Sequence, residues 1–260
     1  MANAVADKPL FVVREAGTLF AVSLDGIRNI PKIRQWWQEY LRQCWFISKV
    51  TSIPVMLISI PFGMVIALHV GSFSRQLGAE SATGAAMVLA IVREAAPVAT
   101  ALLIAGAGGS AMTADLGSRR IRDEIAAMEV MAVDPISRLV TPRLLAASTV
   151  ALFLVSLVSV AGLAGGYVFN VLVQHVTAGA YFSGFTQLVQ LPDLWQSLAK
   201  AWVFGFLAAM VSCYKGLYCK GGPKGVGDAV NQGVVITFIL IFFVNFVMTT
   251  LYFALVPQKF

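Results

Sequence analysis

The chain has 260 residues, of which 58% are hydrophobic and only 12% are charged. A soluble domain carries about 25% charged residues, so this composition excludes an ordinary soluble protein and indicates a polytopic membrane protein. We expect residues 1–260 to fold as a single domain. The net charge of +6 is compatible with nucleic-acid binding, so the positions of the charged residues along the chain decide what it means.

The first predicted element is a helix over about residues 30–48 that lies in the membrane interface. Pro31 suits the first turn of such a helix. Tryptophans interleaved with Lys and Arg are typical of helices that lie in the interface plane. The aromatic and basic residues of this stretch and its flank are Trp36, Trp37, Tyr40, Trp45, Phe46, Lys32, Arg34, Arg42 and Lys49. The alternative is a solvated cytoplasmic helix that packs on the protein.

Five apolar stretches follow, and each approaches or exceeds the length needed to cross a bilayer, about 20 residues. They cover about residues 50–71, 84–113, 144–171, 198–214 and 234–255. The sequence therefore predicts an all-α polytopic membrane protein with five transmembrane helices, an interfacial helix before them and a cytoplasmic helix between the second and third spans.

The basic residues alternate from one side of the predicted spans to the other. The segment before the first span and the loops after the second and fourth spans hold 15 of the 19 Lys and Arg residues. The alternate loops, residues 72–83 and 172–197, hold only Arg75. Because Lys and Arg gather on the cytoplasmic side, we expect a cytoplasmic N-terminus and an extracytoplasmic C-terminus. The net charge then reflects membrane topology, and no nucleic-acid partner is expected.

Arg93 and Glu94 interrupt the second span close to Pro97, in the stretch I-V-R-E-A-A-P-V-A-T. A charge at the bilayer centre costs about 2.5–3.5 kcal/mol on insertion scales, so it must be paired or face water. Pro97 also lacks the N–H that would bond the Arg93 carbonyl, which leaves a polar backbone group beside the charges. We predict that these three residues form a polar rim on a substrate cavity in the outer half of the span. The alternative is an arginine that reaches the outer interface with Glu94 as its local partner.

The segment Arg122–Pro135, R-D-E-I-A-A-M-E-V-M-A-V-D-P, is polar and has the spacing of a helix. One helix is expected over Ser118–Met131, and Asp134-Pro135 ends it, because a residue before proline avoids helical geometry. Its apolar face comprises Ile121, Ile125, Met128 and Ala132. Its expected ion pairs are Arg119–Asp123 and Arg120–Glu124. Such a helix either docks a cytosolic partner or packs on its own bundle.

Small residues four apart indicate close contacts between helices in a membrane. These spacings are Gly162–Gly166, Ala161–Gly165 and Gly106–Ser110. The run 106–111 also fits G-x-G-x-x-A, but it lies inside an apolar helix, so it indicates packing and not nucleotide binding.

The chain has no G-x-x-x-x-G-K-[ST] loop and no catalytic constellation, so an enzyme is not expected. The three cysteines and two histidines lack metal-ligand spacing, and no metal or cofactor is expected in this chain.

Two long motifs occur in order at residues 92–117 and 124–143. They read V-R-E-A-A-P-V-A-T-A-L-L-I-A-G-A-G-G-S-A-M-T-A-D-L-G and E-I-A-A-M-E-V-M-A-V-D-P-I-S-R-L-V-T-P-R. Together they closely resemble the MlaE/YrbE permease family. The five-span layout and N-terminal interfacial helix of that family extend the resemblance to most of the chain, but not to the first 30 residues or the outer loop 173–196.

The resemblance implies a permease subunit of an ABC transporter that moves lipids across the bacterial inner membrane. It implies a second permease subunit, two cytosolic ATPase subunits that hold ATP and Mg²⁺, and an MCE-domain assembly on the outer side. It places Arg93 and Glu94 near a lipid-binding cavity. The residues that it implies for the contact with the ATPase are Glu124, Met128, Glu129, Met131, Asp134 and Pro135.

Ala107 stands where many bacterial members of the family carry arginine, as in A-G-R-A-G-S-A. The role of that arginine is therefore not carried over to this chain. Its loss fits either a less anionic ligand or a partner permease that supplies the charge. The second reading favours a heterodimer over a homodimer, as in actinobacterial YrbE pairs. A non-transporting scaffold that recruits a cytosolic partner through residues Arg122–Pro135 remains the alternative to a transporter.

Overall fold

The computed structural model describes residues 3–78, 83–187 and 190–256, and all of its regular structure in these ranges is helical. A few side chains within these ranges are not described: residues 3–14, 16, 32–35, 180, 186 and 187. In the described part of the chain, five helical segments are long and apolar enough to cross a membrane. The prediction of an all-α polytopic membrane protein with five spans is confirmed, and each predicted stretch lies inside one of these segments.

The spans are longer than the apolar stretches that predicted them, and two of them include π-helical turns. The first is α2 (Ile33–Gln76), the fourth is α9 (Leu191–Leu217) and the fifth is α10 (Gly222–Leu255). The second runs through α3 (Thr83–Val88), η3 (Leu89–Ala95), α4 (Ala96–Leu103), η4 (Ile104–Gly109) and α5 (Ser110–Ile121). The third runs through η5 (Ile136–Val140), α7 (Thr141–Val168) and η6 (Phe169–Val173).

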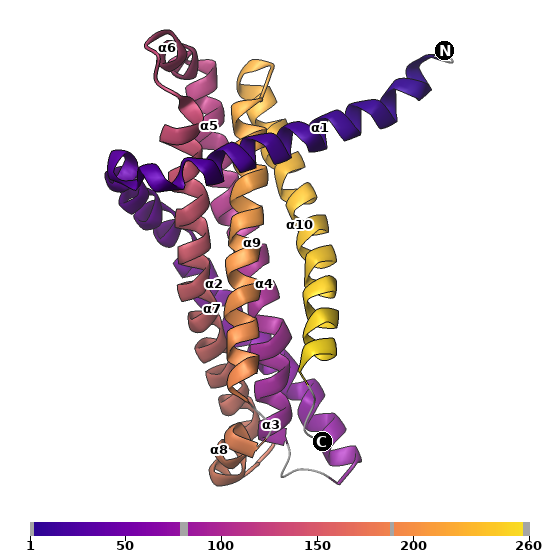
Figure 1. Cartoon of the computed structure of the whole chain (residues 1–260). Helices are drawn as coiled ribbons and strands as arrows, with labels where there is room; N and C mark the ends of the chain where they lie inside the picture. The colour runs from indigo at the N-terminus through magenta and orange to yellow at the C-terminus, as the bar shows by residue number, and fades with distance from the viewer. Residues whose placement is uncertain (1–2, 79–82, 188–189, 257–260) are drawn as a thin grey trace.

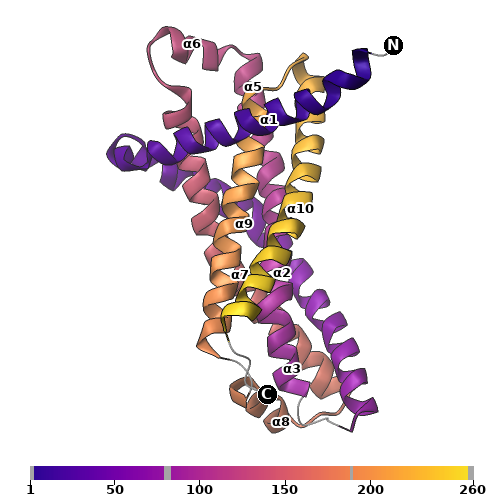
Figure 2. The same cartoon turned by 45° about the vertical axis from the view of Figure 1, so that its right-hand side comes forward.

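Helix α1 (Asn3–Arg28) lies across one end of the bundle, roughly perpendicular to the spans (Figures 1 and 2). It is fastened to the start of α7, where the Thr141 hydroxyl donates a hydrogen bond of 3.1 Å to the Gly26 carbonyl. Phe20, Leu24 and Ile27 lie along α1 at helical spacing and are exposed. Helix α1 therefore has the orientation expected of an interfacial helix. No structure was predicted from the sequence for these residues.

The separate helix expected over residues 30–48 is a wrong prediction. A single 3₁₀ turn, η1 (Ile30–Lys32), follows α1, and residues 33–48 then form the first turns of α2 without a break before the first span. Trp36 is buried and donates to the Asn29 carbonyl, whereas Trp45 is largely exposed. The side chains of Lys32 and Arg34, which belonged to that prediction, lie outside the described residues.

Helices α2 and α7 approach each other at backbone distance because glycines face the contact. A Cβ on Gly63 would overlap the carbonyl oxygen of Gly162, and one on Gly165 would overlap that of Ile60. The predicted packing role of the α7 glycines is thus confirmed. A Cβ on Gly106 would meet nothing within 4 Å of this chain, so no close contact within the bundle accounts for this glycine.

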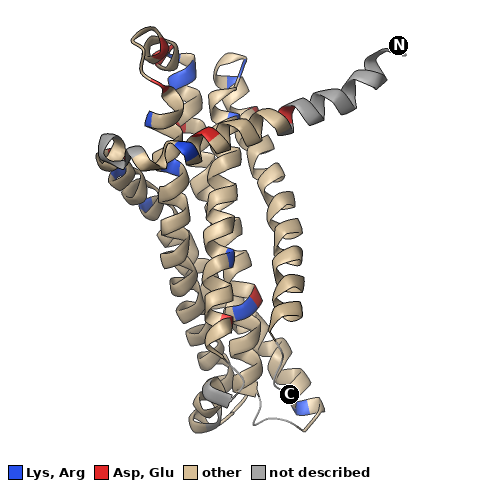
Figure 3. Ribbon diagram, viewed as in Figure 1, with Lys and Arg blue, Asp and Glu red and all other residues tan. Residues whose placement is uncertain are grey.

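Most charged residues gather at the end of the bundle where α1, the short helix α6 (Glu124–Val130) and the α9–α10 connection lie (Figure 3). At the opposite end are α3, α8 (Ala178–Gln187) and the end of α10 (Figure 1). A small group of charged residues stands apart, inside the bundle and well away from the charged end (Figure 3). The two ends of the bundle thus differ in charge as the Lys and Arg pattern predicted.

Candidate functional site

Two ion pairs join the second span to α9 inside the bundle. An Arg93 nitrogen, Nη2, lies 2.6 Å from Asp193 Oδ1, and Nε donates to the same oxygen at 3.0 Å. Two turns further along α9, Lys200 Nζ lies 2.8 Å from Glu94 Oε1. Asp193 and Lys200 are two helical turns apart, so they lie on the same face of α9. Each charge of this membrane-embedded cluster is therefore paired with an opposite one, as burial in a bilayer requires.

Helix α10 closes the cluster with three polar side chains at helical spacing. The Tyr252 hydroxyl donates to Asp193 Oδ1 at 2.6 Å, and the Thr249 hydroxyl donates to Glu94 Oε1 at 3.1 Å. Asn245 Nδ2 also donates to the Glu94 carboxylate, at 3.4 Å. We call this set the polar cluster: Arg93, Glu94, Asp193, Lys200, Asn245, Thr249 and Tyr252. It ties the second, fourth and fifth spans together.

Pro97 explains why a lysine lies beside the Arg93 carbonyl. Because proline has no N–H, the Arg93 carbonyl loses its α-helical partner, and Lys200 Nζ donates to that oxygen at 3.2 Å instead. The preceding turns are π-helical, and the N–H of Ala96 bonds the carbonyl of Ile91, five residues back. The predicted polar backbone group beside the charged pair is thus confirmed.

The polar cluster is closed on one side and open on another. Lys200 is 0% exposed, whereas the Glu94 side chain, its ionic partner, is 39% exposed. Gln196 is buried on the Asp193–Lys200 face of α9, and its amide oxygen and nitrogen have no hydrogen-bond partner among the described residues. The cluster therefore holds two cations and two anions, and the Gln196 amide beside them can still donate and accept hydrogen bonds.

Sequence reasoning found Arg93, Glu94 and Pro97 but missed the rest of the polar cluster. Lys200 was visible as a charge inside an apolar helix, which is a functional signal in a membrane protein. Asp193 lies at the start of α9, where its Oδ2 accepts from the Gln190 N–H at 2.9 Å and so also caps the helix. The α10 residues carry no signal of their own in the sequence, because polar side chains such as Thr249 and Tyr252 are common in membrane helices.

The short helix at the charged end differs from its prediction. Helix α5 ends at Ile121, Asp123 adopts a left-handed conformation with φ 56°, and α6 then begins at Glu124. One helix over Ser118–Met131 is therefore wrong. The expected ion pairs fail for the same reason, since the turn at Asp123 changes the helical register. The pairs that form instead are Arg119–Asp115 at 3.3 Å, Arg119–Glu124 at 3.7 Å and Arg122–Glu124 at 2.9 Å.

Helix α6 and the turn after it present apolar side chains to the surroundings. Val130 is 88% exposed and Met131 is 65% exposed, whereas Ile125 is buried. Met128 is half-buried, so the predicted apolar face is divided between the bundle and the surface. Ala132, the last member of that face, has φ 57° and lies outside the helix.

A cavity of about 290 Å³ lies beneath α6, beside the end of α9. Its lining residues are Arg120, Ile125, Glu129, Asp134, Pro135, Ile136, Leu217 and Tyr218. Three of the residues implied for ATPase contact, Glu129, Asp134 and Pro135, are thus brought together. Asp134 also has a structural role, because its carboxylate accepts from the N–H groups of Ile136 at 3.0 Å and Ser137 at 3.1 Å.

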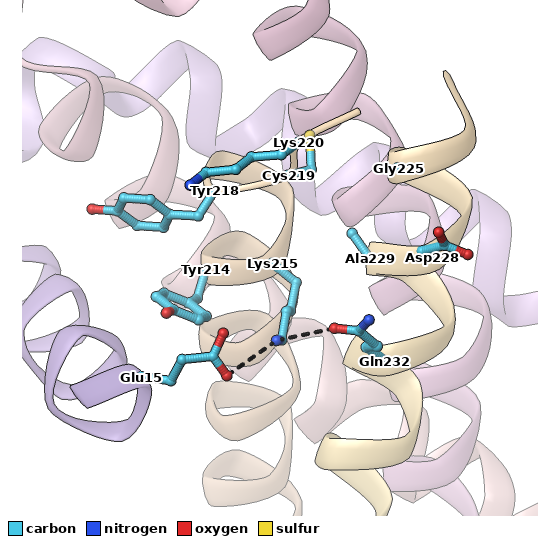
Figure 4. Close-up of a pocket in the computed structure, with 10 residues that line it drawn as sticks. All are labelled: Glu15, Tyr214, Lys215, Tyr218, Cys219, Lys220, Gly225, Asp228, Ala229 and Gln232. Carbon is cyan, nitrogen blue, oxygen red and sulfur yellow. Dashed lines mark hydrogen bonds and ion pairs between the residues drawn. The ribbon is translucent and has the colours of Figure 1, made fainter. Parts of the chain in front are cut away.

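A second cavity, of about 250 Å³, lies at the same end between α1, α9 and α10 (Figure 4). Lys215 Nζ stands between Glu15 Oε2 at 3.6 Å and Gln232 Oε1 at 3.3 Å. The hydroxyls of Thr18 and Tyr214 lie 3.0 Å apart beside it. These contacts fasten α1 over the ends of the last two spans.

Known proteins resemble most of this chain. The family described as "Permease MlaE" matches residues 40–251. A "Probable ABC transporter permease protein" of Rickettsia bellii is 32% identical over 254 residues, which cover 97% of this chain and 98% of that protein. "Protein TRIGALACTOSYLDIACYLGLYCEROL 1, chloroplastic" of Arabidopsis thaliana is 30% identical, over 87% of this chain and 65% of that protein. The "Intermembrane phospholipid transport system permease protein MlaE" of Haemophilus influenzae is 28% identical, over 86% of each chain. This chain belongs to the MlaE permease family.

Proposed function

We propose that this chain is the permease subunit of an ATP-driven ABC transporter that moves lipids or other hydrophobic molecules across the bacterial inner membrane. The polar cluster is the observation that carries the proposal, because four paired charges inside a bundle are costly unless they serve a function. The printed name of the Haemophilus influenzae relative, which refers to phospholipid transport, supports a lipid as substrate.

The surroundings of Glu94 suit an amphipathic molecule. Glu94 is the partly exposed member of the polar cluster, and α10 is the least buried of the five spans. Phe246 and Phe253 are exposed on α10 close to the residues that contact Glu94 and Asp193. In the proposal, the polar end of a lipid lies at Arg93 and Glu94 beside Pro97, and its chains lie along the apolar surface of α10.

The energy for transport comes from partner subunits in this proposal, because the chain lacks a nucleotide-binding loop. Two cytosolic ATPase subunits, which bind ATP and Mg²⁺, dock at α6, on its exposed last residue Val130 and the exposed Met131 that follows it. The N-terminus is cytoplasmic and the C-terminus extracytoplasmic. A second permease subunit, related but not identical, completes the transmembrane part, and MCE-domain proteins bind on the outer side.

The test is to purify the complex with its ATPase partner, reconstitute it in proteoliposomes, and measure lipid transfer. Glu94→Gln removes the charge that faces the ligand and keeps its shape, so we expect transfer to fall about tenfold or more. Co-purification of the ATPase is expected to be unchanged, because Glu94 lies in η3, and α4, η4 and α5 separate it from α6.

Glu39→Gln is the matched control, because Glu39 forms an ion pair with Arg42 near the start of α2. Native mass spectrometry of the purified complex gives the second measurement. Absence of bound lipid, together with wild-type transfer in Glu94→Gln, would contradict the proposal. If the ATPase still co-purified in that case, the chain would be a scaffold that recruits it through residues Arg122–Pro135.

A further inference from the structure

A continuous series of ion pairs connects α6 with the interior of the bundle. Arg143, near the start of α7, is 0% exposed, and its Nη2 lies 2.5 Å from Asp115 Oδ2 on α5. Asp115 also pairs with Arg119 Nε at 3.3 Å, and Arg119 Nη1 lies 3.7 Å from Glu124 Oε2 on α6. We call this series the charge relay: Arg143, Asp115, Arg119 and Glu124. It crosses from a fully buried arginine to α6, whose residues Glu129 and Val130 are exposed.

The buried end of the charge relay depends on Asp115. The Arg143 guanidinium donates from Nη1 to the Leu139 carbonyl at 2.7 Å, and its Nε has no hydrogen-bond partner among the described residues. Asp115 supplies the opposite charge that the buried guanidinium needs. Because an uncompensated charge in an apolar interior is strongly unfavourable, a movement of Asp115 must be followed by Arg143.

The helix is not continuous between α6 and either neighbouring span. Asp123 with φ 56° separates it from α5, and Ala132 with φ 57° separates it from the third span. Each is a turn in left-handed geometry, which interrupts the run of helical hydrogen bonds. Ile125 is buried and Met128 packs against the core, and the charge relay adds an ionic attachment of α6 to α5 and α7.

From this arrangement we infer that Asp115 and Arg143 are positioning residues that transmit the movement of α6 to the second and third spans. When a docked ATPase shifts α6, Glu124 draws Arg119 and Asp115 with it, and the paired Arg143 moves the start of α7. The inference rests on the proposed function for the identity of the ATPase, but the mechanical link between α6 and α7 belongs to this chain alone.

The first measurement uses the isolated permease in lipid nanodiscs and needs no partner. Asp115→Asn keeps the size of the side chain and removes its charge, so α6 loses its attachment to Arg143. We expect the amides of residues 124–131 to exchange hydrogen about fivefold faster than in the wild type. Asp115→Glu restores the charge and is expected to restore slow exchange. Equal exchange in Asp115→Asn and the wild type would overturn the inference.

The second measurement uses the complete complex and compares lipid transferred per ATP hydrolysed. Asp115→Asn is expected to lower this ratio about tenfold while the ATPase still co-purifies, and Asp115→Glu is expected to recover it. A purely structural role would lower complex yield and leave the ratio unchanged. Asp25→Asn is the matched control, because Asp25 pairs with Arg28 on the exposed side of α1.

Glu124→Gln tests the relay from its exposed end, where folding is not at risk. If the relay acts as one unit, the double variant Asp115→Asn, Glu124→Gln transfers no less lipid per ATP than the worse single variant. Losses that multiply would overturn the inference. A wild-type complex that neither binds an ATPase nor transfers lipid would count against the proposed function, while the exchange measurement would still decide the inference.

Discussion

At the scale of single residues, the polar cluster shows how a membrane interior tolerates charge. Lys200 is enclosed by one carboxylate, one hydroxyl and one backbone carbonyl, and each acceptor comes from a neighbouring span. Arg93 lies over the rings of Tyr252 and Phe253, each 5.5 Å from the guanidinium carbon, so aromatic faces add to its ion pair. The charges are thus stabilised by contacts from three spans and not by a single partner.

Removing one member of the cluster is therefore more damaging than removing a pair. Lys200→Met leaves Glu94 without its cation, and we expect the free energy of unfolding to fall by about 2 kcal/mol. This is less than for a fully buried pair, because the Glu94 side chain is 39% exposed. The double variant Glu94→Gln, Lys200→Met is expected to recover most of the loss. Thermal unfolding in detergent checks this, and additive losses in the double variant would contradict it.

At the scale of elements, the contact between α2 and α7 sets the position of the first span. Two apolar helices in a bilayer gain little from hydrophobic burial, so close backbone packing has to hold them together. Gly63 and Gly165 provide it, since a Cβ on either would overlap a backbone carbonyl oxygen of the other helix. Pro54 and Pro61 lie within α2 near this contact, and α2 nevertheless continues through both as one helix.

Gly63→Ala tests this contact. The added methyl group would overlap the Gly162 carbonyl oxygen, which belongs to a backbone and cannot rotate away. We expect the variant to lose more than about 2 kcal/mol of stability as the helices separate. Gly106→Ala is the control, because its methyl group meets nothing within 4 Å and is expected to be neutral or slightly stabilising. A Gly63→Ala protein as stable as the control would show that α2 and α7 are not in backbone contact at Gly63.

At the scale of the whole molecule, five spans place the two ends of the chain on opposite sides of the bundle (Figure 2). Helix α1, α6 and the α9–α10 connection all lie at the basic end of the bundle. A single orientation of the bundle therefore puts all three on the same side of the membrane. If that end is cytoplasmic, the cavities beneath α6 and beside Lys215 both face the compartment in which ATPase subunits reside.

Cysteine labelling in intact cells tests this orientation. In a cysteine-free background, Leu77→Cys at the sparsely charged end is expected to react with a membrane-impermeant maleimide, because residue 77 is exposed. Lys220→Cys at the basic end is expected to react only after the cells are opened. The native Cys219 is a poorer probe, because burial raises the pKa of its thiol and so lowers the fraction of reactive thiolate. If Lys220→Cys were labelled in intact cells, the orientation of the protein in the membrane would be the opposite of the expected one.

The sequence by itself determined the number of spans, the end of the bundle that is basic and the presence of charges within the second span. These are local properties, because a helix in a bilayer must satisfy its own backbone hydrogen bonds and its length can be read from the apolar residues alone. The loss of the α-helical partner of the Arg93 carbonyl was predictable for the same reason, since Pro97 lies four residues away.

Only the tertiary structure decided which residues complete the site. Asp193 and Lys200 lie about 100 residues beyond Arg93 and Glu94, and their pairing depends on how α9 is rotated against the second span. The path of α1 across the bundle and the turn at Asp123 are also set by contacts between distant segments. Local patterns specify which residues form helices, whereas the relative rotation and packing of those helices specify which side chains meet.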